Sequence, residues 1–340
     1  MKKLKVAVVG FGVIGKRVAH AINLQEDMEL AGIADVITDW RMRSAITRGY
    51  AIYAATQEAD SAMRSAGIEV QGNVKELLEK CDVVVDCTPK KIAAENVNTY
   101  RDMGLKFILH GGEKHSTTGH SFSAEYNYAS AIDRDCTRVV SCNTTSMLRT
   151  LGALKRAGLL VKARGTLLRR ATDPWESHLG GIMNTLVPER EIPSHQGPDA
   201  QSVDPDLDVV TAAVKVPQTL SHTHYWTVEM TRNAAKDEVL SAFATSSRIL
   251  LIEYDNGLVS NNTIKEMFLD AERPWGDMYE VAIWKDMLKV VGNELYFAYT
   301  VDNQAIVIPE TIDAIRALSG IEHSGPRSIA QTDQSLGMIK

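Results

Sequence analysis

The chain has 340 residues, of which 44% are hydrophobic, and a formal net charge of −6. This length allows one or two domains, and the composition excludes wholesale disorder. The acidic balance gives no reason to expect nucleic acid as a partner. No apolar run reaches the length of a membrane span, and the first apolar run leads into glycines without a cleavage site, so we expect a cytoplasmic protein that does not bind membranes.

The first half of the sequence alternates short apolar runs with segments of helical periodicity. We expect strands at residues 4–9, 28–34, 82–87, 106–110 and 138–142. Helical patterns cover residues 13–23, 73–81 and 90–103. Continuous apolar strands that alternate with helices are typical of a parallel sheet covered on both faces. This pattern predicts an α/β, doubly wound, NAD(P)-binding domain of the Rossmann type over residues 1–140.

The second half of the sequence predicts a different sheet. Longer strands are expected at residues 162–173, 207–217, 222–230 and 293–301. Helices are expected at residues 235–247, 262–271 and 309–320. Such strands favour a mixed or antiparallel sheet, hence an α+β catalytic and substrate domain over residues 141–302. Residues 303–340 hold the last helix, which we expect to return to the first domain, and a polar tail with no clear pattern.

Three glycines, Gly10, Gly12 and Gly15, have the spacing G-x-G-x-x-G between the first predicted strand and the first predicted helix. In this context the glycines allow a tight turn, close approach of the backbone to a pyrophosphate, and close packing of helix on strand. The unpaired amides at the start of the helix suit an anion. The pattern favours a dinucleotide site, and a purely structural turn is the alternative.

Asp35 follows the second predicted strand, about 20 residues after Gly15. An acidic side chain there commonly accepts hydrogen bonds from the adenine ribose and repels a 2′-phosphate, which favours NAD over NADP. Arg41 and Arg43 follow soon after and offer charge for NADP. The alternative is that Asp35 is a solvated turn residue.

Four cysteines, Cys81, Cys87, Cys136 and Cys142, lack the spacing of zinc ligands, and we expect them to be reduced. Cys142 differs from the others because it precedes a predicted helix at residues 144–157. A helix N-terminus lowers the pKa of a thiol and can stabilise an oxyanion. Cys142 is therefore either a nucleophile or a buried, unreactive thiol.

A nucleophilic thiol needs a base, and "SHTHYW" places His222 and His224 on the same face of a predicted strand. The alternatives are a hydrogen-bonded pair without catalytic role, or a metal site, for which a third ligand is lacking. His195 lies in a turn-rich loop. The adjacent Arg169 and Arg170 indicate either an anion site or a surface salt bridge.

Together these segments resemble the archaeal-type (class II) glyceraldehyde-3-phosphate dehydrogenases. The resemblance covers nearly the whole chain and rests on "GFGVIGKRV", "HGGEK", "RVVSCNTTSMLRTLGAL", "LLRRATDP", "LVPEREIPSHQGPD", "AVKVPQTLSHTH", "GNELYF", "PETIDAIRAL" and "SIAQTDQSLGM". It implies a homotetramer with an N-terminal Rossmann domain. It also implies oxidation and phosphorylation of glyceraldehyde 3-phosphate by inorganic phosphate, through a cysteine thioester, with NAD or NADP as hydride acceptor.

The resemblance also implies roles for individual residues. Cys142 matches the nucleophile of the family and His222 its base. The implied substrate contacts are Ser141, Cys142, Asn143, His195 and Gln196, and Arg169 lies beside them as a candidate anion contact. The implied cofactor contacts, besides the glycine loop, are Val13, Ile14, Gly112, Arg170 and Asn303.

Four positions depart from the pattern of the family. Val9 replaces an asparagine before the glycine loop, and Asp35 with Val36 replaces a Lys/Thr pair that suits NADP. Gln196 replaces the second histidine of a His-His pair. Asp302 and Asn303 replace a His-Gln pair near the nicotinamide.

Two other functions fit the same features. One is a dehydrogenase of another phosphorylated aldehyde, or an acyl-phosphate reductase that runs in reverse. The other is a nicotinamide-binding sensor without catalysis.

Overall fold

The computed structural model describes residues 3–110, 112–174 and 184–338. They form two compact units. The first contains the chain up to Val140 together with Ile308–Leu336, and the second contains Ser141–Val307 with the residues from Gly337 onwards. The first unit is therefore discontinuous in sequence, because the second is inserted between its two parts.

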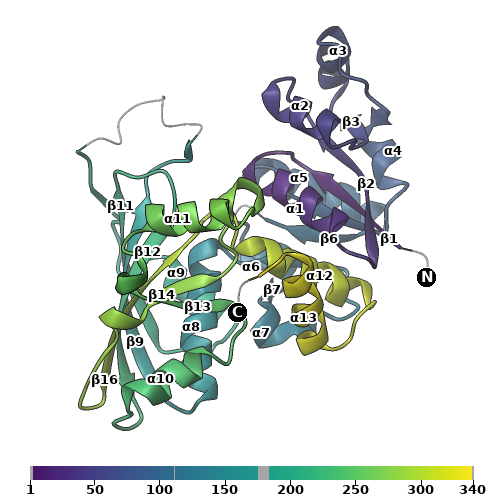
Figure 1. Ribbon diagram of the computed structural model, residues 1–340. Coiled ribbons are helices and arrows are strands. Elements are labelled where there is room, and N and C mark those ends of the chain that lie inside the picture. Colours follow the sequence, from purple (N-terminus) through teal and green to yellow (C-terminus); the bar gives the residue numbers. More distant parts are fainter. Residues whose placement is uncertain (1–2, 111, 175–183, 339–340) are drawn as a thin grey trace. The chain divides into compact units, whose positions relative to one another are not determined.

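A parallel sheet of eight described strands forms the centre of the first unit (Figure 1). Its strands are β1 (Leu4–Val9), β2 (Met28–Asp35), β3 (Ile52–Ala54), β4 (Gly72–Asn73), β5 (Val83–Asp86), β6 (Lys106–Leu109), β7 (Ser121–Phe122) and β8 (Cys136–Val139). Their order is β4-β3-β2-β1-β5-β6-β8-β7, and neighbouring strands pair in parallel throughout. The predicted parallel, Rossmann-like sheet is confirmed.

Helices connect these strands, and two more follow the inserted second unit. They are α1 (Val13–Asn23), α2 (Trp40–Thr47), α3 (Gln57–Ser65), α4 (Val74–Leu78), α5 (Lys90–Asp102), α6 (His115–Thr118), α7 (Ala124–Asn127), α12 (Val307–Ser319) and α13 (Gly325–Ser335). The sequence patterns give no prediction for α2, α3, β3 or α13. The helix α4 is shorter than the predicted 73–81, and its capping box between Asn73 and Glu76 fixes its start.

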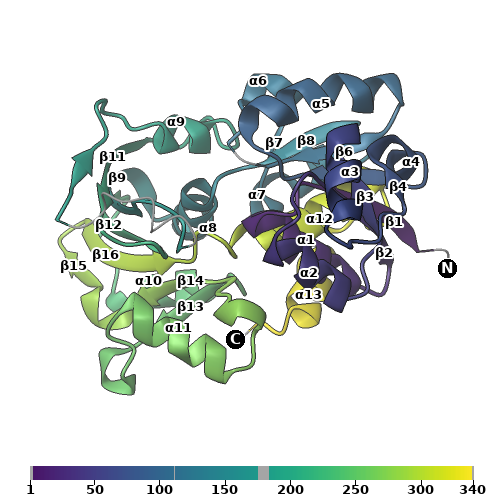
Figure 2. The same cartoon turned by 90° about the horizontal axis from the view of Figure 1, so that it is seen from above.

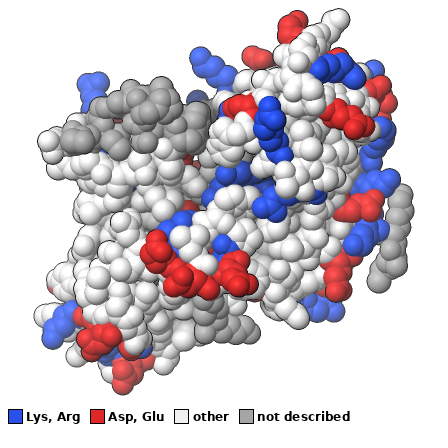
Figure 3. Space-filling model, turned by 45° about the horizontal axis from the view of Figure 1, so that its top comes forward, with Lys and Arg blue, Asp and Glu red and all other residues white. Residues whose placement is uncertain are grey.

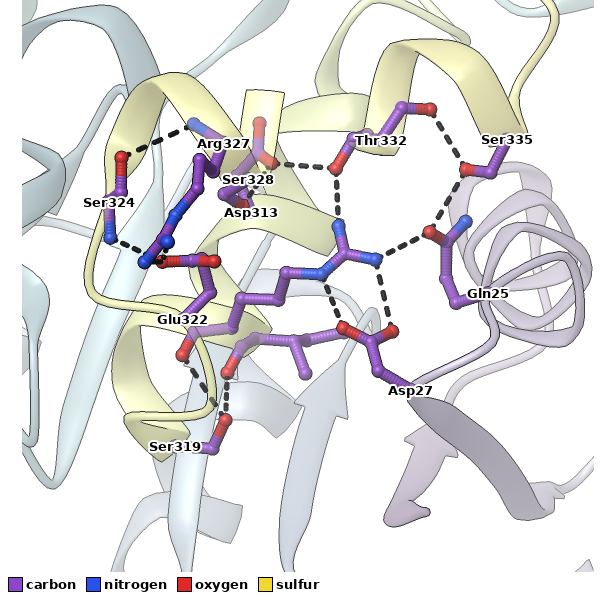
Figure 4. A network of polar contacts seen from close by, with 12 residues as sticks. Gln25, Asp27, Asp313, Ser319, Glu322, Ser324, Arg327, Ser328, Thr332 and Ser335 are labelled. Carbon is purple, nitrogen blue, oxygen red and sulfur yellow. Dashed lines mark hydrogen bonds and ion pairs between the residues drawn. The ribbon is translucent and has the colours of Figure 1, made fainter. Parts of the chain in front are cut away.

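The last two helices are fastened to the first unit by a buried guanidinium. Arg316 on α12 is fully buried and donates to both carboxylate oxygens of Asp27, to Gln25 and to the hydroxyl of Thr332 (Figure 4). Asp313 accepts hydrogen bonds from Ser328 and Thr332 on α13 (Figure 4). Because a buried charge must be paired, this network ties both helices to the loop before β2.

The second unit is built on a mixed sheet. Its strands are β9 (Leu160–Arg170), β10 (Val187–Pro188), β11 (Val209–Val216), β12 (His222–Met230), β13 (Ile249–Ile252), β14 (Val281–Trp284), β15 (Lys289–Val291) and β16 (Glu294–Val301). The order is β10-β11-β9-β12-β16-β14-β13, with β15 beside β16. β9 pairs in parallel with β11 and antiparallel with β12, which confirms the predicted mixed sheet.

One helix runs through the core of the second unit. α8 (Cys142–Arg156) contacts β9, β14 and β16, and Figure 2 shows it beside the sheet of this unit. Every residue of α8 from Asn143 to Leu154 is buried. A helix that is buried all round is a central element of its domain. The other helices of this unit are α9 (Gln196–Gln201), α10 (Lys236–Phe243) and α11 (Asn261–Asp270).

The boundary between β8 and α8 corrects one prediction. The expected strand at 138–142 ends at Val139, and Cys142 is the first residue of α8 instead of the last of a strand. The helix therefore begins two residues before the predicted start at 144.

Among the described residues, none of the helices combines the length and apolarity that crossing a membrane requires. On the face drawn in Figure 3, basic and acidic side chains are interspersed.

Candidate active site

The glycine loop of the first unit has the backbone geometry of an anion site. Gly10 has φ +89°, and a Cβ on it would lie 2.8 Å from the main chain of Cys87. A Cβ on Gly15 would lie 1.8 Å from the carbonyl oxygen of Gly10. A Cβ on Gly12 would meet nothing within 4 Å, and no side chain caps the N-terminus of α1. The loop therefore places the uncapped N-terminus of α1 beside open space, which fits a dinucleotide pyrophosphate.

Asp35, the last residue of β2, is linked to this loop. Its Oδ2 accepts from the amide of Phe11 at 2.5 Å, and its Oδ1 accepts from Val36 at 2.6 Å. The neighbouring Arg41 is held by Asp39, whose carboxylate accepts from its Nε at 3.0 Å. The loop thus has a carboxylate at its end, and the nearest arginine already has an anionic partner.

The other cofactor candidates of the first unit lie at two turns. Val13 and Ile14 are the first two residues of α1. Gly112 follows β6 and has φ +80°, and a Cβ on it would meet nothing within 4 Å. Both positions are at the carboxyl ends of parallel strands, where ligands of such sheets bind.

Cys142 lies at the N-terminus of α8 in the second unit. Ser141 caps this helix, because its hydroxyl accepts from the amide of Thr144 at 3.3 Å. Burial raises the pKa of the Cys142 thiol, although the charges of Arg170 and Arg169 and the amide of Asn143 act to lower it. The lowered pKa expected from the helix terminus is therefore wrong for this chain without ligands, since desolvation outweighs the favourable charges.

The two histidines of β12 are both buried, on the inner face of the sheet. The Nδ1 of His222 accepts from the main-chain N–H of Arg170 at 3.0 Å. Burial, with smaller effects from His224, Arg170 and Arg169, holds the pKa of His222 well below its ordinary value. The ring is therefore neutral, and because Nδ1 accepts, its proton is on Nε2.

His224 uses both ring nitrogens. Its Nδ1 lies 2.7 Å from the hydroxyl of Tyr299, and its Nε2 lies 2.9 Å from Oδ1 of Asn143. Burial, with a smaller effect from Arg169, lowers the pKa of His224 to about 3. The Nδ2 of Asn143 in turn donates to the sulfur of Cys142 at 3.8 Å. The ring of His224 is thus neutral, and both of its nitrogens have hydrogen-bond partners.

The adjacent arginines of β9 both have acidic partners. Arg169 donates to Glu189 at 2.9 Å, and Arg170 donates to Asp173 at 3.2 Å. Both arginines therefore form salt bridges, which the sequence analysis gave as the alternative to an anion site. Both guanidinium groups still act on Cys142 electrostatically, and the Nε of each is buried without a partner among the described residues. The Nε–H groups of both arginines can therefore donate hydrogen bonds to a bound anion.

His195 and Gln196 differ in their surroundings. The Nδ1 of His195 lies 2.5 Å from Glu189, and its side chain is 62% exposed. Burial acts to raise the pKa of Glu189, but the hydrogen bond from His195 and the charges of His195 and Arg169 outweigh it and lower that pKa. A cavity of about 360 Å³ is lined by Arg169, Glu189, His195 and Lys215, among others. Gln196 is fully buried instead.

Several buried polar atoms of the second unit have no hydrogen-bond partner in the part of the chain that the structure describes. They are Thr145 Oγ1, Arg169 Nε, Arg170 Nε, both amide atoms of Gln196, Nδ2 of Asn303, Trp226 Nε1 and Arg273 Nε. Native proteins rarely leave such atoms unsatisfied without a water or ligand. Arg169, Arg170, Gln196 and Asn303 are predicted site residues, and Thr145 is in the first turn of α8. Their positions indicate a region that receives a polar ligand.

The two residues that replace the His-Gln pair follow β16. Asp302 is buried and lies 3.6 Å from Lys265. Asn303 accepts from the amide of Ser221 at 2.8 Å, which supports the left-handed conformation of that residue at φ +68°. A non-glycine residue with this φ is uncommon and usually has a local reason, here the turn before β12.

The structure thus brings most predicted substrate residues together in the second unit. Cys142, Asn143, His222, Arg169 and Arg170 are linked by hydrogen bonds or by charge, and His195 is joined to Arg169 through Glu189.

Sequence reasoning missed four residues of this network: Glu189, Tyr299, Asp173 and Lys265. Glu189 carries a signal in retrospect, since an acidic residue near His195 in a turn-rich loop can pair with the arginines. The other three carry no local signal.

No group of three or more metal-ligating side chains occurs among the residues that the structure describes. All four cysteines are described, and each is a free thiol.

Comparison with known proteins gives consistent results over the whole chain. Residues 141–287 match the family model of the glyceraldehyde 3-phosphate dehydrogenase C-terminal domain. Residues 4–144 match the model of the dihydrodipicolinate reductase N-terminus.

Full-length relatives are also similar. Glyceraldehyde-3-phosphate dehydrogenase 2 of Methanosarcina barkeri is 42% identical over 338 residues, which cover 99% of each chain. The glyceraldehyde-3-phosphate dehydrogenase of Methanococcoides burtonii is 43% identical and covers 99% of this chain and 100% of its own. That of Pyrococcus abyssi is 41% identical, with coverage of 99% and 100%.

Proposed function

Because the chain belongs to the archaeal-type glyceraldehyde-3-phosphate dehydrogenase family, we propose that it oxidises glyceraldehyde 3-phosphate with inorganic phosphate to 1,3-bisphosphoglycerate, using a nicotinamide cofactor. The observation that carries the proposal is the surroundings of Cys142. The thiol is at the first residue of a buried helix, and the charges of Arg170 and Arg169 and the amide of Asn143 favour its thiolate against the effect of burial. We assign the first unit to cofactor binding and the second to catalysis.

The reaction begins with the sulfur of Cys142. The thiol loses its proton to solvent, and Arg170 and Arg169 favour the thiolate that results. The thiolate attacks the aldehyde carbon, so a C–S bond forms and the carbonyl oxygen takes the negative charge. Amides at the start of α8 stabilise this oxygen. A bound nicotinamide would supply the hydride acceptor for that carbon, and loss of the hydride would leave a thioester on Cys142.

We assign His222 a revised role in this step. The resemblance predicts a base, but a ring that accepts from Arg170 at Nδ1 carries its proton on Nε2. Such a ring donates a hydrogen bond to the developing oxyanion and takes up no proton there. Hydride can leave directly from that oxyanion, so the step needs no base.

Inorganic phosphate then attacks the thioester. The C–S bond breaks, the acyl phosphate leaves, and Cys142 returns as thiolate. The unsatisfied donors of Arg169 and Arg170 and the exposed ring of His195 suit phosphate oxygens. We propose Ser141, Asn143 and Gln196 as the remaining substrate contacts.

For the cofactor we propose NAD in preference to NADP. Asp35 closes the glycine loop with a carboxylate, and Arg41 is paired with Asp39 instead of free to hold a 2′-phosphate. Gly10, Gly12, Val13, Ile14, Gly15 and Gly112 would hold the dinucleotide, with Arg170 and Asn303 as contacts from the second unit.

We also propose a homotetramer. The second unit exposes large apolar side chains, among them Ile192 in the loop after β10 at 71% and Tyr225 on β12 at 46%, and both line the same surface hollow. Apolar patches of this kind commonly mark an interface between subunits. Analytical ultracentrifugation tests this assembly.

One initial-rate assay tests the proposed function. Glyceraldehyde 3-phosphate, phosphate and NAD or NADP are combined, and absorbance of the reduced nicotinamide is followed. We expect turnover that depends on phosphate and is faster with NAD. A Cys142→Ser variant should lose turnover and keep its affinity for NAD. Activity retained by that variant, or a clear preference for another phosphorylated aldehyde, would contradict the proposal.

A further inference from the structure

The second histidine of β12 lies at the centre of a buried chain of hydrogen bonds that ends at the catalytic sulfur. Tyr299, His224 and Asn143 come from β16, β12 and α8, and all three are buried. The links measure 2.7 Å from Tyr299 to His224, 2.9 Å from His224 to Asn143, and 3.8 Å from Asn143 to Cys142.

The chemistry of these groups gives the chain a direction. The amide of Asn143 has one acceptor and one donor end, and its Oδ1 faces Nε2 of His224. The oxygen can only accept, so Nε2 of His224 carries the proton. The neutral ring then has an acceptor at Nδ1, which the hydroxyl of Tyr299 satisfies. With Oδ1 engaged in this way, the NH₂ group of Asn143 faces the sulfur.

We propose that His224 is a positioning residue, which fixes the amide of Asn143 so that its NH₂ group donates to the sulfur of Cys142. A reversed amide would direct an oxygen at the sulfur and repel the thiolate. The two histidines thus have separate tasks: His222 serves the substrate oxygen, and His224 serves the sulfur. This inference rests on the proposed function only in taking Cys142 as the nucleophile.

Other groups also act on the sulfur and have to stay constant in a test. Arg169 and Arg170 on β9 favour the thiolate, and Asp302 after β16 opposes it. None of the three hydrogen bonds to His224, so a change at His224 leaves their charges in place.

The test measures the rate of iodoacetamide alkylation of Cys142 against pH, read by mass spectrometry of the peptide that contains it. In His224→Phe the ring remains next to Tyr299, where the rings are now 4.8 Å apart, but both hydrogen bonds are lost. We expect the midpoint to move to higher pH. Below the midpoint, alkylation should be about three to ten times slower, the effect of losing one hydrogen bond.

Two further variants separate positioning from simple stability. In His224→Gln the side-chain amide offers one donor and one acceptor, so the profile should stay within about twofold of wild type. The matched control is His120→Phe in the first unit. His120 is also buried, and its two ring nitrogens contact Thr137 and Ser130 at 2.7 and 2.8 Å. It should lose stability without a change in alkylation.

An unchanged profile in His224→Phe, with a loss of stability like that of His120→Phe, would overturn the proposal. If His224→Phe does not fold, Asn143→Asp decides the matter, because a carboxylate facing the sulfur should shift the midpoint upward. No shift in that variant would also overturn it. The readout is independent of turnover, so failure of the proposed function appears separately, as wild-type protein without activity on glyceraldehyde 3-phosphate.

Discussion

α1 and α8 differ at their N-termini, because a side chain caps α8 and no side chain caps α1. At α1 the N-cap is Gly12, which has no side chain, and open space lies in front of it. At α8 the hydroxyl of Ser141 caps the helix, and the polar side chains behind it are buried. An uncapped terminus can receive an external anion, whereas a capped terminus holds one of its own side chains in place. The site at α1 is therefore built from main-chain groups, whereas the site at α8 is built from side chains.

If the α8 site depends on single side chains, the largest effect apart from the loss of Cys142 itself should come from His222. We expect His222→Ala to lower kcat about 100- to 1,000-fold, as for removal of one oxyanion donor, with little change in the KM for NAD. His222→Gln retains an N–H donor and should recover part of the rate. Steady-state kinetics check this. Equal loss in both variants would favour a base and contradict the donor role.

The α1 site should instead respond to added atoms. In Gly15→Ala the new Cβ meets the carbonyl oxygen of Gly10, so we expect about 3 kcal/mol lower stability, the upper range for overpacking. In Gly12→Ala the Cβ meets nothing in the protein, so stability should hold while NAD binding weakens. Thermal unfolding and calorimetric titration measure the two effects. A Gly15→Ala protein as stable as wild type, with unchanged affinity for NAD, would contradict the claim that the α1 site has no room for added atoms at Gly15.

Acid should affect both units, because each buries neutral histidine. Burial lowers the pKa of His110 to about 4, and below the ordinary value of 6.5 only the unfolded chain takes up this proton. Stability is therefore full above that value and falls as pH falls towards 4. Between pH 7 and pH 5 we expect a loss of about 2 kcal/mol from His110. In chemical unfolding, the free energy of unfolding of His110→Gln should depend less on pH than that of wild type. The same pH dependence in both proteins would contradict the role assigned to His110.

The smallest effect concerns the cap itself. Ser141→Ala removes the hydroxyl that accepts from Thr144, and we expect about 1 kcal/mol lower stability of the second unit. The α1 terminus has no such cap to lose. Urea unfolding of Ser141→Ala beside wild type measures the difference. A cost near zero would mean that the first turn of α8 is held by packing alone.

The local features of this molecule could be read from the sequence. β1, α1 and β12 have the predicted bounds, because their apolar periods and flanking glycines or turns are local signals. The glycine loop and the position of Cys142 at a helix start depend on neighbouring residues in the same way. Short or polar elements such as α2 and α13 were missed, since their burial depends on partners far along the chain.

The contacts inside the catalytic unit could not be predicted. Asn143 and His224 are 81 residues apart, and their meeting depends on how α8 lies across the sheet. The acceptor at Nδ1 of His222 follows from the register that sets Thr223 opposite Leu168. Neither can be obtained from residue types and spacing.

The guanidinium of Arg316 has a consequence for biosynthesis. Its partners Asp27 and Gln25 emerge early from the ribosome, while Arg316 and Thr332 are translated only after the whole inserted unit. The carboxylate of Asp27 therefore has no ion pair with Arg316 until the end of the chain has been translated. The hydrogen-bond network around Arg316 can therefore form only after the inserted unit has been translated, and a fragment that ends at Val140 would lack both of the helices that this network holds.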